Sequence, residues 1–204
     1  MVFPARIVLA TRNQKKRVEL QRILTTHSIG CEVLTLADFP GYVDDVVEDA
    51  PDFEGNAILK ARSAFSATGV PAVADDSGLC VDALNGMPGI FSARWSGTGD
   101  DQRNLELVLA QIRDVPSARR SAAFVAAVAF VDADDCVVVR GEMSGHLVTE
   151  PRGSDGFGYD PIFVAHGQQL TNAELAPEVK DDLSHRGQAL RSLVEALAHR
   201  GVAN

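Results

Sequence analysis

Two adjacent carboxylates follow a short apolar stretch in the segment ADDSGL, residues 74–79. Asp75 and Asp76 repel each other and resist burial unless a cation, hydrogen-bond donors or water compensates. The apolar residues 70–74 predict a buried strand, and α/β folds place ligand sites at the carboxyl ends of strands. A carboxylate there can bind Mg²⁺ or orient a water molecule. The open alternative is a turn in which both acids accept hydrogen bonds from backbone amides.

An acidic loop at residues 42–51 offers further oxygen ligands. Glu48 and Asp49 in this loop could complete a metal site with the acidic pair. Surface loops are often acidic, so a solvated loop explains the two residues equally well.

A polar turn, TRNQKK at residues 11–16, lies between a predicted strand and a predicted helix. Backbone amides at a helix N-terminus, the amide of Asn13 and the ammonium of Lys16 suit a bound phosphate. The glycines of a P-loop, and its G-x-x-x-x-G-K-[ST] signature, are absent from the sequence. A basic, solvated turn therefore stays open as the other interpretation.

Two later segments combine aromatic, acidic and basic side chains. The segment GSDGFGYD, residues 153–160, could hold a flat ring against Phe157 while Asp160 accepts hydrogen bonds, or it forms a glycine-rich hairpin loop. In SHR, residues 184–186, Arg186 offers a planar fork of donors and His185 a donor or acceptor. Taken alone, this second segment is explained by a helix cap and two exposed polar residues.

Predicted strands and helices alternate with these polar segments. Strands are expected at residues 6–10, 31–36 and 70–74, with a hairpin of long strands at 119–131 and 136–148. Helices are expected at residues 14–24, 52–67, 100–112 and 183–198, where apolar residues recur at helical spacing. A strand, a polar turn and a helix at the start of the chain indicate an α/β fold.

Composition and charge narrow the class of protein. The 204 residues fit one domain or two small lobes, and 46% hydrophobic with 23% charged residues is typical of a soluble globular protein. A net charge of -9 argues against general binding to nucleic acid or to a membrane surface. With no run of about 18 apolar residues and no signal-peptide order of charges, a cytoplasmic location is expected.

The cysteine pattern favours reduced thiols. Cys31, Cys80 and Cys136 are widely separated and odd in number, without a C-x-x-C pair. Neither a disulfide framework nor a zinc site is expected from this pattern. We predict core thiols instead.

Six motifs follow one another in a fixed order: T-x-N-x-x-K at 11–16, F-x-x-N-A at 53–57, ADDSGL at 74–79, GxPGIxSARxSG at 86–97, GFGYDPIF at 156–163 and SHRGQAL at 184–190. With this series the chain resembles the inosine/xanthosine triphosphate pyrophosphatase family over nearly its whole length. The resemblance implies a single α/β domain, residues 1–204, with a long central mixed β-sheet flanked by helices. It also implies two lobes with a cleft between them and assembly as a homodimer.

The resemblance further implies a Mg²⁺-dependent hydrolase of noncanonical purine nucleotides. Such an enzyme cleaves ITP, dITP or XTP between the α- and β-phosphates and releases the monophosphate and pyrophosphate. Asp76 matches the catalytic acid, and Asp76 and Glu48 match the metal ligands. The residues that match substrate-binding positions are Thr11, Asn13, Lys16, Ser77, Phe157, Gly158, Tyr159, Asp160, Lys180, His185 and Arg186, with Phe157 as the stacking platform and Lys60 as a further candidate for the phosphates.

A departure in the first loop and two alternatives accompany this resemblance. Arg12 and Lys15 stand in the first loop where the family often has glycine, which leaves the backbone path near the phosphates open. The alternatives are a nucleotide-binding module without turnover and a pyrophosphatase for modified pyrimidine nucleotides. Asp76 and the lysines favour turnover, and the SHR and GFGYD motifs favour purines.

Overall fold

The computed structural model describes residues 4–11, 14–26, 29–40 and 46–200. The strands are β1 (Arg6–Leu9), β2 (Glu32–Thr35), β3 (Ala72–Val81), β4 (Ser121–Val131), β5 (Cys136–Leu147) and β6 (Phe163–Ala165). The helices are α1 (Gln14–Thr26), α2 (Phe53–Thr68), α3 (Asp101–Gln111), α4 (Pro177–Leu183) and α5 (His185–Arg200). Two residues of the predicted phosphate loop, Arg12 and Asn13, lie outside the described residues.

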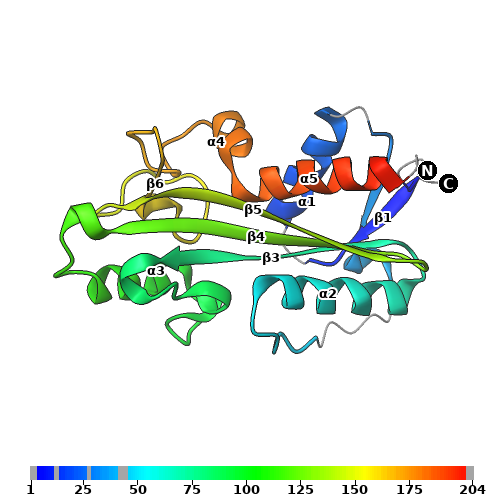
Figure 1. Ribbon diagram of the computed structural model, residues 1–204, viewed down its shortest axis with the longest axis horizontal. Helices are drawn as coiled ribbons and strands as arrows, with labels where there is room; N and C mark the ends of the chain where they lie inside the picture. The colour runs from blue at the N-terminus through cyan, green and yellow to red at the C-terminus, as the bar shows by residue number, and fades with distance from the viewer. Residues whose placement is uncertain (1–3, 12–13, 27–28, 41–45, 201–204) are drawn as a thin grey trace. The chain divides into compact units, whose positions relative to one another are not determined.

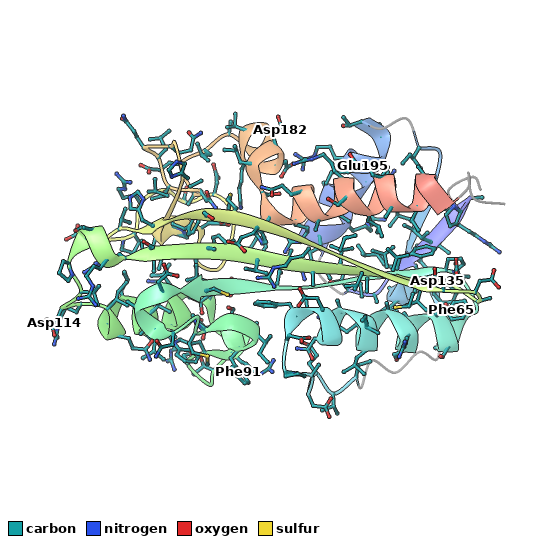
Figure 2. The ribbon with its side chains drawn as sticks, viewed as in Figure 1. Phe65, Phe91, Asp114, Asp135, Asp182 and Glu195 are labelled. Carbon is teal, nitrogen blue, oxygen red and sulfur yellow. The ribbon has the colours of Figure 1, made fainter. Side chains whose placement is uncertain are left out.

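The described strands form one mixed sheet in the order β2-β1-β3-β4-β5-β6. β1 runs parallel to β2, with Ile7 opposite Val33, and parallel to β3, with Val8 opposite Ala72. β6 runs antiparallel to β5. The turn between β4 and β5 contains Asp135, labelled in Figure 2. The predicted mixed sheet flanked by helices is therefore confirmed (Figure 1).

The chain divides into two compact units, and β3, β4 and β5 contribute residues to both. The first unit comprises residues 1–76, 126–141 and 186–204, and the second comprises residues 77–125 and 142–185. The expected two lobes and the cleft between them stay predictions.

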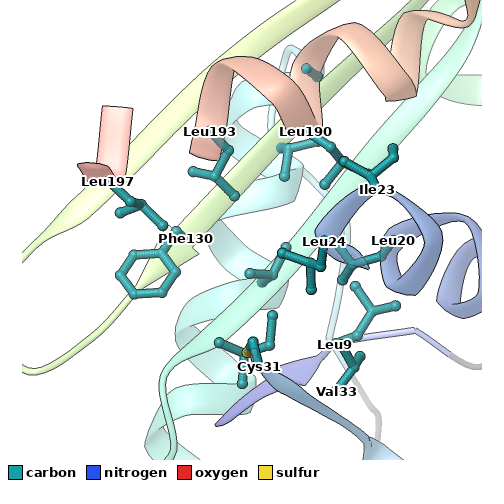
Figure 3. Packing of buried hydrophobic residues seen from close by; sticks show 14 of the residues in the cluster. Leu9, Leu20, Ile23, Leu24, Cys31, Val33, Phe130, Leu190, Leu193 and Leu197 are labelled. Atoms are coloured by element: carbon teal, nitrogen blue, oxygen red, sulfur yellow. The ribbon is translucent and has the colours of Figure 1, made fainter. Parts of the chain in front are cut away.

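In the first unit, helices cover both faces of the sheet: α1 and α5 lie on one face and α2 on the other (Figure 1). The core beneath α1 and α5 is built from leucine and isoleucine side chains that pack against Phe130 of β4 (Figure 3). Their spacing on each helix is the amphipathic spacing that the sequence predicts. Six of them are Leu20, Ile23, Leu24, Leu190, Leu193 and Leu197.

Helix α2 begins and ends at the residues that its sequence favours. Asp52 caps its N-terminus and accepts a hydrogen bond from the Gly55 amide at 2.8 Å. Gly69 ends the helix in the left-handed conformation, with φ of 66°, which glycine adopts without strain. The helix therefore has fixed ends, and its position presents Asn56 and Lys60 to β3.

In the second unit, α3 and the strands enclose a separate core that includes Leu105, Phe124 and Phe163. Gly78 of β3 lies so close to the turn Gly89–Arg94 that a Cβ there would overlap the Gly89 carbonyl and the Ser92 side chain. The Leu79 amide donates to Ser92 Oγ at 2.9 Å. The glycine of ADDSGL is thus required for packing.

Three features differ from the sequence-based expectation. The predicted strand at 70–74 extends to Val81, so the acidic pair lies inside β3 and not at its end. The short helix α4 was not predicted. Cys31 is buried, but Cys80 and Cys136 are only half-buried, so the prediction of core thiols holds for Cys31 alone. Within the described residues, no helix is long and apolar enough to cross a bilayer.

Candidate active site

The acidic pair lies inside β3, so its two side chains point to opposite faces of the sheet. Successive residues of a strand point to opposite sides, so Asp75 shares a face with Val73, and Asp76 shares a face with Ala74. Val73 belongs to the core beneath α1 and α5. Asp75 therefore points toward those helices, and Asp76 points toward α2. Mutual repulsion of the carboxylates is reduced by this divergence.

Asp75 is buried between two cations of the first unit. Its Oδ2 atom lies 2.9 Å from Lys16 Nζ of α1 and 3.1 Å from Arg186 Nε at the start of α5. Burial by itself opposes ionisation of Asp75, but the two positive charges outweigh it and hold the pKa of this carboxyl below its usual range. The carboxylate thereby fixes two of the residues expected at the nucleotide.

Lys16 contributes an ammonium in a desolvated position. Burial lowers the pKa of Lys16, and the adjacent Asp75 carboxylate opposes that shift. Thr11 is the first residue of the predicted phosphate loop and follows β1. It is half-buried, and its amide donates to the Leu9 carbonyl at 2.8 Å. The described part of the loop thus combines a local backbone turn with a cation held in place by Asp75.

Asp76 faces α2 and meets an ammonium and an amide. Its Oδ1 atom lies 2.8 Å from Lys60 Nζ, and its Oδ2 atom accepts from Asn56 Nδ2 at 3.3 Å. Lys60 Nζ also lies 3.6 Å from Glu48 Oε1. The two carboxylates expected as metal ligands therefore converge on one cation. The alternative of a turn stabilised by backbone amides does not describe the pair.

The pKa of Asp76 moves in the opposite direction from that of Asp75. Burial raises the pKa of Asp76, Lys60 partly offsets this, and the nearby Glu48 charge raises it further. A carboxyl with a raised pKa is a better proton acceptor than an ordinary aspartate when it is ionised. The two neighbouring acids are thus suited to different tasks.

Asn56 connects the acidic loop to the carboxylate. This fully buried side chain accepts a hydrogen bond from the Ala50 amide at 3.1 Å while it donates to Asp76. The contact explains the asparagine in the F-x-x-N-A motif. The same contact holds the backbone at Ala50, two residues after Glu48. The Glu48 side chain is 32% exposed. Asp49, the other acid of the loop, is exposed.

The second unit contains a cluster built on Asp160. This buried carboxylate accepts hydrogen bonds from the Phe157 amide at 2.8 Å and from Lys180 Nζ at 2.6 Å, both at Oδ2. Lys180 Nζ lies 5.5 Å from the centroid of the Phe157 ring. The ring is 37% exposed, so Phe157 is not tucked into the core. Asp160 accepts hydrogen bonds as the sequence predicts, and an aromatic face remains accessible.

Gly156 allows this cluster to close. A Cβ on Gly156 would overlap the Asp160 carboxylate and would lie 2.9 Å from Lys180 Nζ, and its φ of 78° is unfavourable for other residues. Asn172, which is also buried, donates from Nδ2 to Asp160 Oδ1 at 3.3 Å. Both Asp160 oxygens are therefore engaged by residues of the second unit.

The remaining predicted residues of the second unit take different positions. Tyr159 is buried, and its hydroxyl donates to the Ser92 carbonyl at 2.8 Å, so its ring belongs to the core. The Gly158 amide donates to Asp101 at 3.0 Å. His185 is buried and stacks on Phe124 with ring centroids 5.1 Å apart. Ser77 is half-buried in β3.

Sequence reasoning considered Asp75 only as one of an acidic pair at a metal site or in a turn, and it assigned no role to Asn56 or Asn172. Asp75 and Asn56 stand inside quoted motifs, so a signal was present for both. Asn172 stands outside every quoted motif, and only its burial against Asp160 reveals it. Within the described residues, no group of three or more histidine, cysteine, aspartate or glutamate side chains is placed to hold a metal.

The fold is that of an α/β protein, and its clusters pair buried aspartates with lysine and arginine side chains. Comparison with known proteins agrees with that class. The model of the Ham1 family matches residues 7–196, and the chain belongs to this family.

The relatives extend over the full chain. The dITP/XTP pyrophosphatase of Nocardia farcinica is 54% identical over 95% of both chains, and that of Mycobacterium tuberculosis strain H37Rv is 52% identical over 97% of both. A crystal structure of a nucleoside-triphosphatase, dITP/XTP pyrophosphatase, from Mycobacterium abscessus has 52% identity and a TM-score of 0.76, covering 92% of this chain and 98% of that one. A HAM1 protein structure from Coxiella burnetii has 39% identity and a TM-score of 0.86, covering 98% and 100%. The predicted family resemblance is thus confirmed.

Proposed function

We propose that the chain is a nucleoside triphosphate pyrophosphatase that hydrolyses ITP, dITP and XTP to the monophosphate and pyrophosphate. Full-length relatives at about half identity carry the name dITP/XTP pyrophosphatase. The structural observation that carries the proposal is the pair Asp76 and Glu48 converging on Lys60. Carboxylates at this position next to buried cations suit a triphosphate.

The donor set fits Mg²⁺. Asp76 and Glu48 supply the hard oxygen ligands that Mg²⁺ prefers, and the same two groups already surround a positive charge in Lys60. Mg²⁺ sites on nucleotides commonly use one or two carboxylates together with phosphate oxygens and water. The bound ion would neutralise charge on the phosphates and on the pyrophosphate leaving group.

The residues of the first unit supply the phosphate chemistry. Lys16 and Arg186 offer positive charge to the phosphates, and Asp75 keeps both side chains in place. Asp76 orients the attacking water or accepts its proton while the bond between the α- and β-phosphates breaks and pyrophosphate leaves. An acidic chain needs these local cations because its net charge of -9 repels a polyanion.

We propose Phe157 as the residue on which the purine base stacks. The exposed Phe157 ring offers a stacking face. Asp160 holds the Phe157 backbone amide, and Lys180 places a positive charge beside the ring. Hypoxanthine and xanthine present a keto acceptor beside an N–H donor, whereas adenine presents an amino donor beside an acceptor. A matched buried edge would reject adenine by about 10⁴-fold. Guanine shares the keto edge, so its 2-amino group must be excluded sterically or left without an acceptor.

The proposal is tested by pyrophosphate release from the purified protein with Mg²⁺ and equal concentrations of dITP, XTP, dGTP, dATP and dUTP. Pyrophosphate from dITP and XTP alone is the expected result. Release chiefly from dUTP would favour an enzyme of pyrimidine nucleotides, and release from none would favour a binding module without turnover. Detection must distinguish pyrophosphate from single phosphate.

Two further parts of the proposal are the homodimer, which the family resemblance implies, and the cytoplasmic location, which is expected from the apolar and charge pattern of the sequence. We propose that the protein is a homodimer located in the cytoplasm. Sedimentation of the purified protein tests the first, with a single species of twice the chain mass expected. Fractionation of cells that produce the protein tests the second.

A further inference from the structure

Lys60 contacts both of the carboxylates that we propose as metal ligands. Its Nζ atom lies 2.8 Å from Asp76 Oδ1 and 3.6 Å from Glu48 Oε1, so it joins the two carboxylates proposed as ligands. The side chain is only 15% exposed, so water screens the contact weakly. The second oxygen of Asp76 is engaged by Asn56. The carboxylates are thus already neutralised in part by the protein itself.

A lone Mg²⁺ ion gains little by displacing this ammonium. Two carboxylates leave most positions of the octahedral ion to water, and no third acidic, histidine or cysteine side chain joins them among the described residues. The displaced ammonium would also lose its contacts with Asp76 and Glu48. A metal ion bound to a triphosphate differs in both respects. Phosphate oxygens supply further ligands to the ion, and the negatively charged phosphates offer the displaced Lys60 ammonium a new partner.

We propose that Lys60 is an internal counter-ion that keeps the two carboxylates together in the nucleotide-free protein and transfers to the phosphates when metal and nucleotide bind together. This inference rests on the proposed function, since it takes a triphosphate as the ligand. Metal binding is then weak without nucleotide and strong with it. The carboxylates are kept in position for the metal without being left as adjacent unpaired charges.

The test measures Mn²⁺ binding to nucleotide-free protein from the electron paramagnetic resonance signal of free Mn²⁺. Lys60→Met removes the ammonium and keeps the length of the side chain. The matched control is Arg62→Met, which removes one positive charge from an exposed position on the same helix. Lys60→Met should bind Mn²⁺ at least about tenfold more tightly than the wild type, because a positive charge is removed from beside the ion. The control should stay within about twofold.

A second arm measures the coupling between metal and nucleotide. With the non-hydrolysable α,β-methylene analogue of dITP present, the wild-type affinity for Mn²⁺ should rise by more than the affinity of Lys60→Met rises. Equal Mn²⁺ affinities for Lys60→Met and Arg62→Met without nucleotide would overturn the counter-ion role. If Lys60→Met does not fold, Lys60→Gln replaces it in both arms. Turnover of dITP by the wild type is scored separately, so failure of the proposed function is distinguished from failure of this inference.

Discussion

Asp75 and Asp76 are consecutive residues of β3, yet their side chains pair with different cations on opposite faces of the sheet. Asp75 contacts Lys16 and Arg186, whereas Asp76 contacts Lys60. The arrangement separates a carboxylate that holds positive side chains in place from one that faces the predicted metal position. Their pKa values shift in opposite directions, which is consistent with different tasks.

Asp75→Asn should destabilise the fold. The substitution leaves the buried Arg186 and the half-buried Lys16 without their carboxylate, and breaking a buried ion pair costs about 3–5 kcal/mol. Urea unfolding at neutral pH measures the change in free energy of unfolding. Asp82→Asn, which removes an exposed carboxylate just after β3, is the control and should be close to neutral. A loss of stability no larger than that of the control would contradict the role of Asp75.

The same carboxylate predicts a pH dependence of stability. The pKa of Asp75 is lowered in the folded protein, so its contribution is present above the unfolded value of about 3.9 and is lost as pH falls through the folded value. Between about pH 5 and pH 3 the wild type should therefore lose more stability than Asp75→Asn. Parallel curves of unfolding free energy against pH for the two proteins would contradict the assignment.

Arg186→Ala should mainly weaken nucleotide binding or specificity. Arg186 lies at the start of α5 and carries a donor fork that Asp75 holds in place. We expect KM for dITP to rise about tenfold or more with a smaller change in kcat, as for the loss of a charged hydrogen bond. Arg186→Lys retains the charge for Asp75 and separates binding from stability. Unchanged kinetics on dITP in both variants would remove Arg186 from the site.

Phe157→Ala tests the stacking platform. Stacking of a base on an aromatic ring is worth about 1–3 kcal/mol, so KM for dITP should rise by about tenfold. Phe91→Ala is the matched control, because Phe91 is an exposed phenylalanine of the same unit that lies beside Arg94, outside the Asp160 cluster. Equal effects of the two substitutions would show that Phe157 contributes no more than an exposed apolar surface.

Local patterns in the sequence predicted most of the fold. The amphipathic spacing in α1 and α5 and the caps Asp52 and Gly69 of α2 follow from residues a few positions apart. The extent of β3 did not follow in this way, because the cations that stabilise Asp75 and Asp76 inside a strand come from distant segments. Arg186 is 111 positions from Asp75.

The candidate site was predictable where its residues stand in motifs, and unpredictable where only packing reveals them. The motif residues Asp76 and Asp160 form contacts with Lys60 and Lys180, and their roles at a nucleotide stay predictions. Lys60 lies in α2 at helical spacing from the motif residue Asn56, yet its contact with both Asp76 and Glu48 depends on the approach of α2 to β3. Asn172 has no sequence signal, because its place beside Asp160 is set by the path of the loop before α4.

The most direct test of the account is pyrophosphate release from dITP with Mg²⁺, measured for the wild type, Asp76→Asn and the exposed-site control Asp82→Asn. Asp76→Asn removes the proposed proton acceptor and metal ligand while its amide keeps the shape of the side chain. The account predicts a loss of at least about 10³-fold for Asp76→Asn, with unchanged circular dichroism and near wild-type turnover for the control. Wild-type turnover in a folded Asp76→Asn protein would contradict the account.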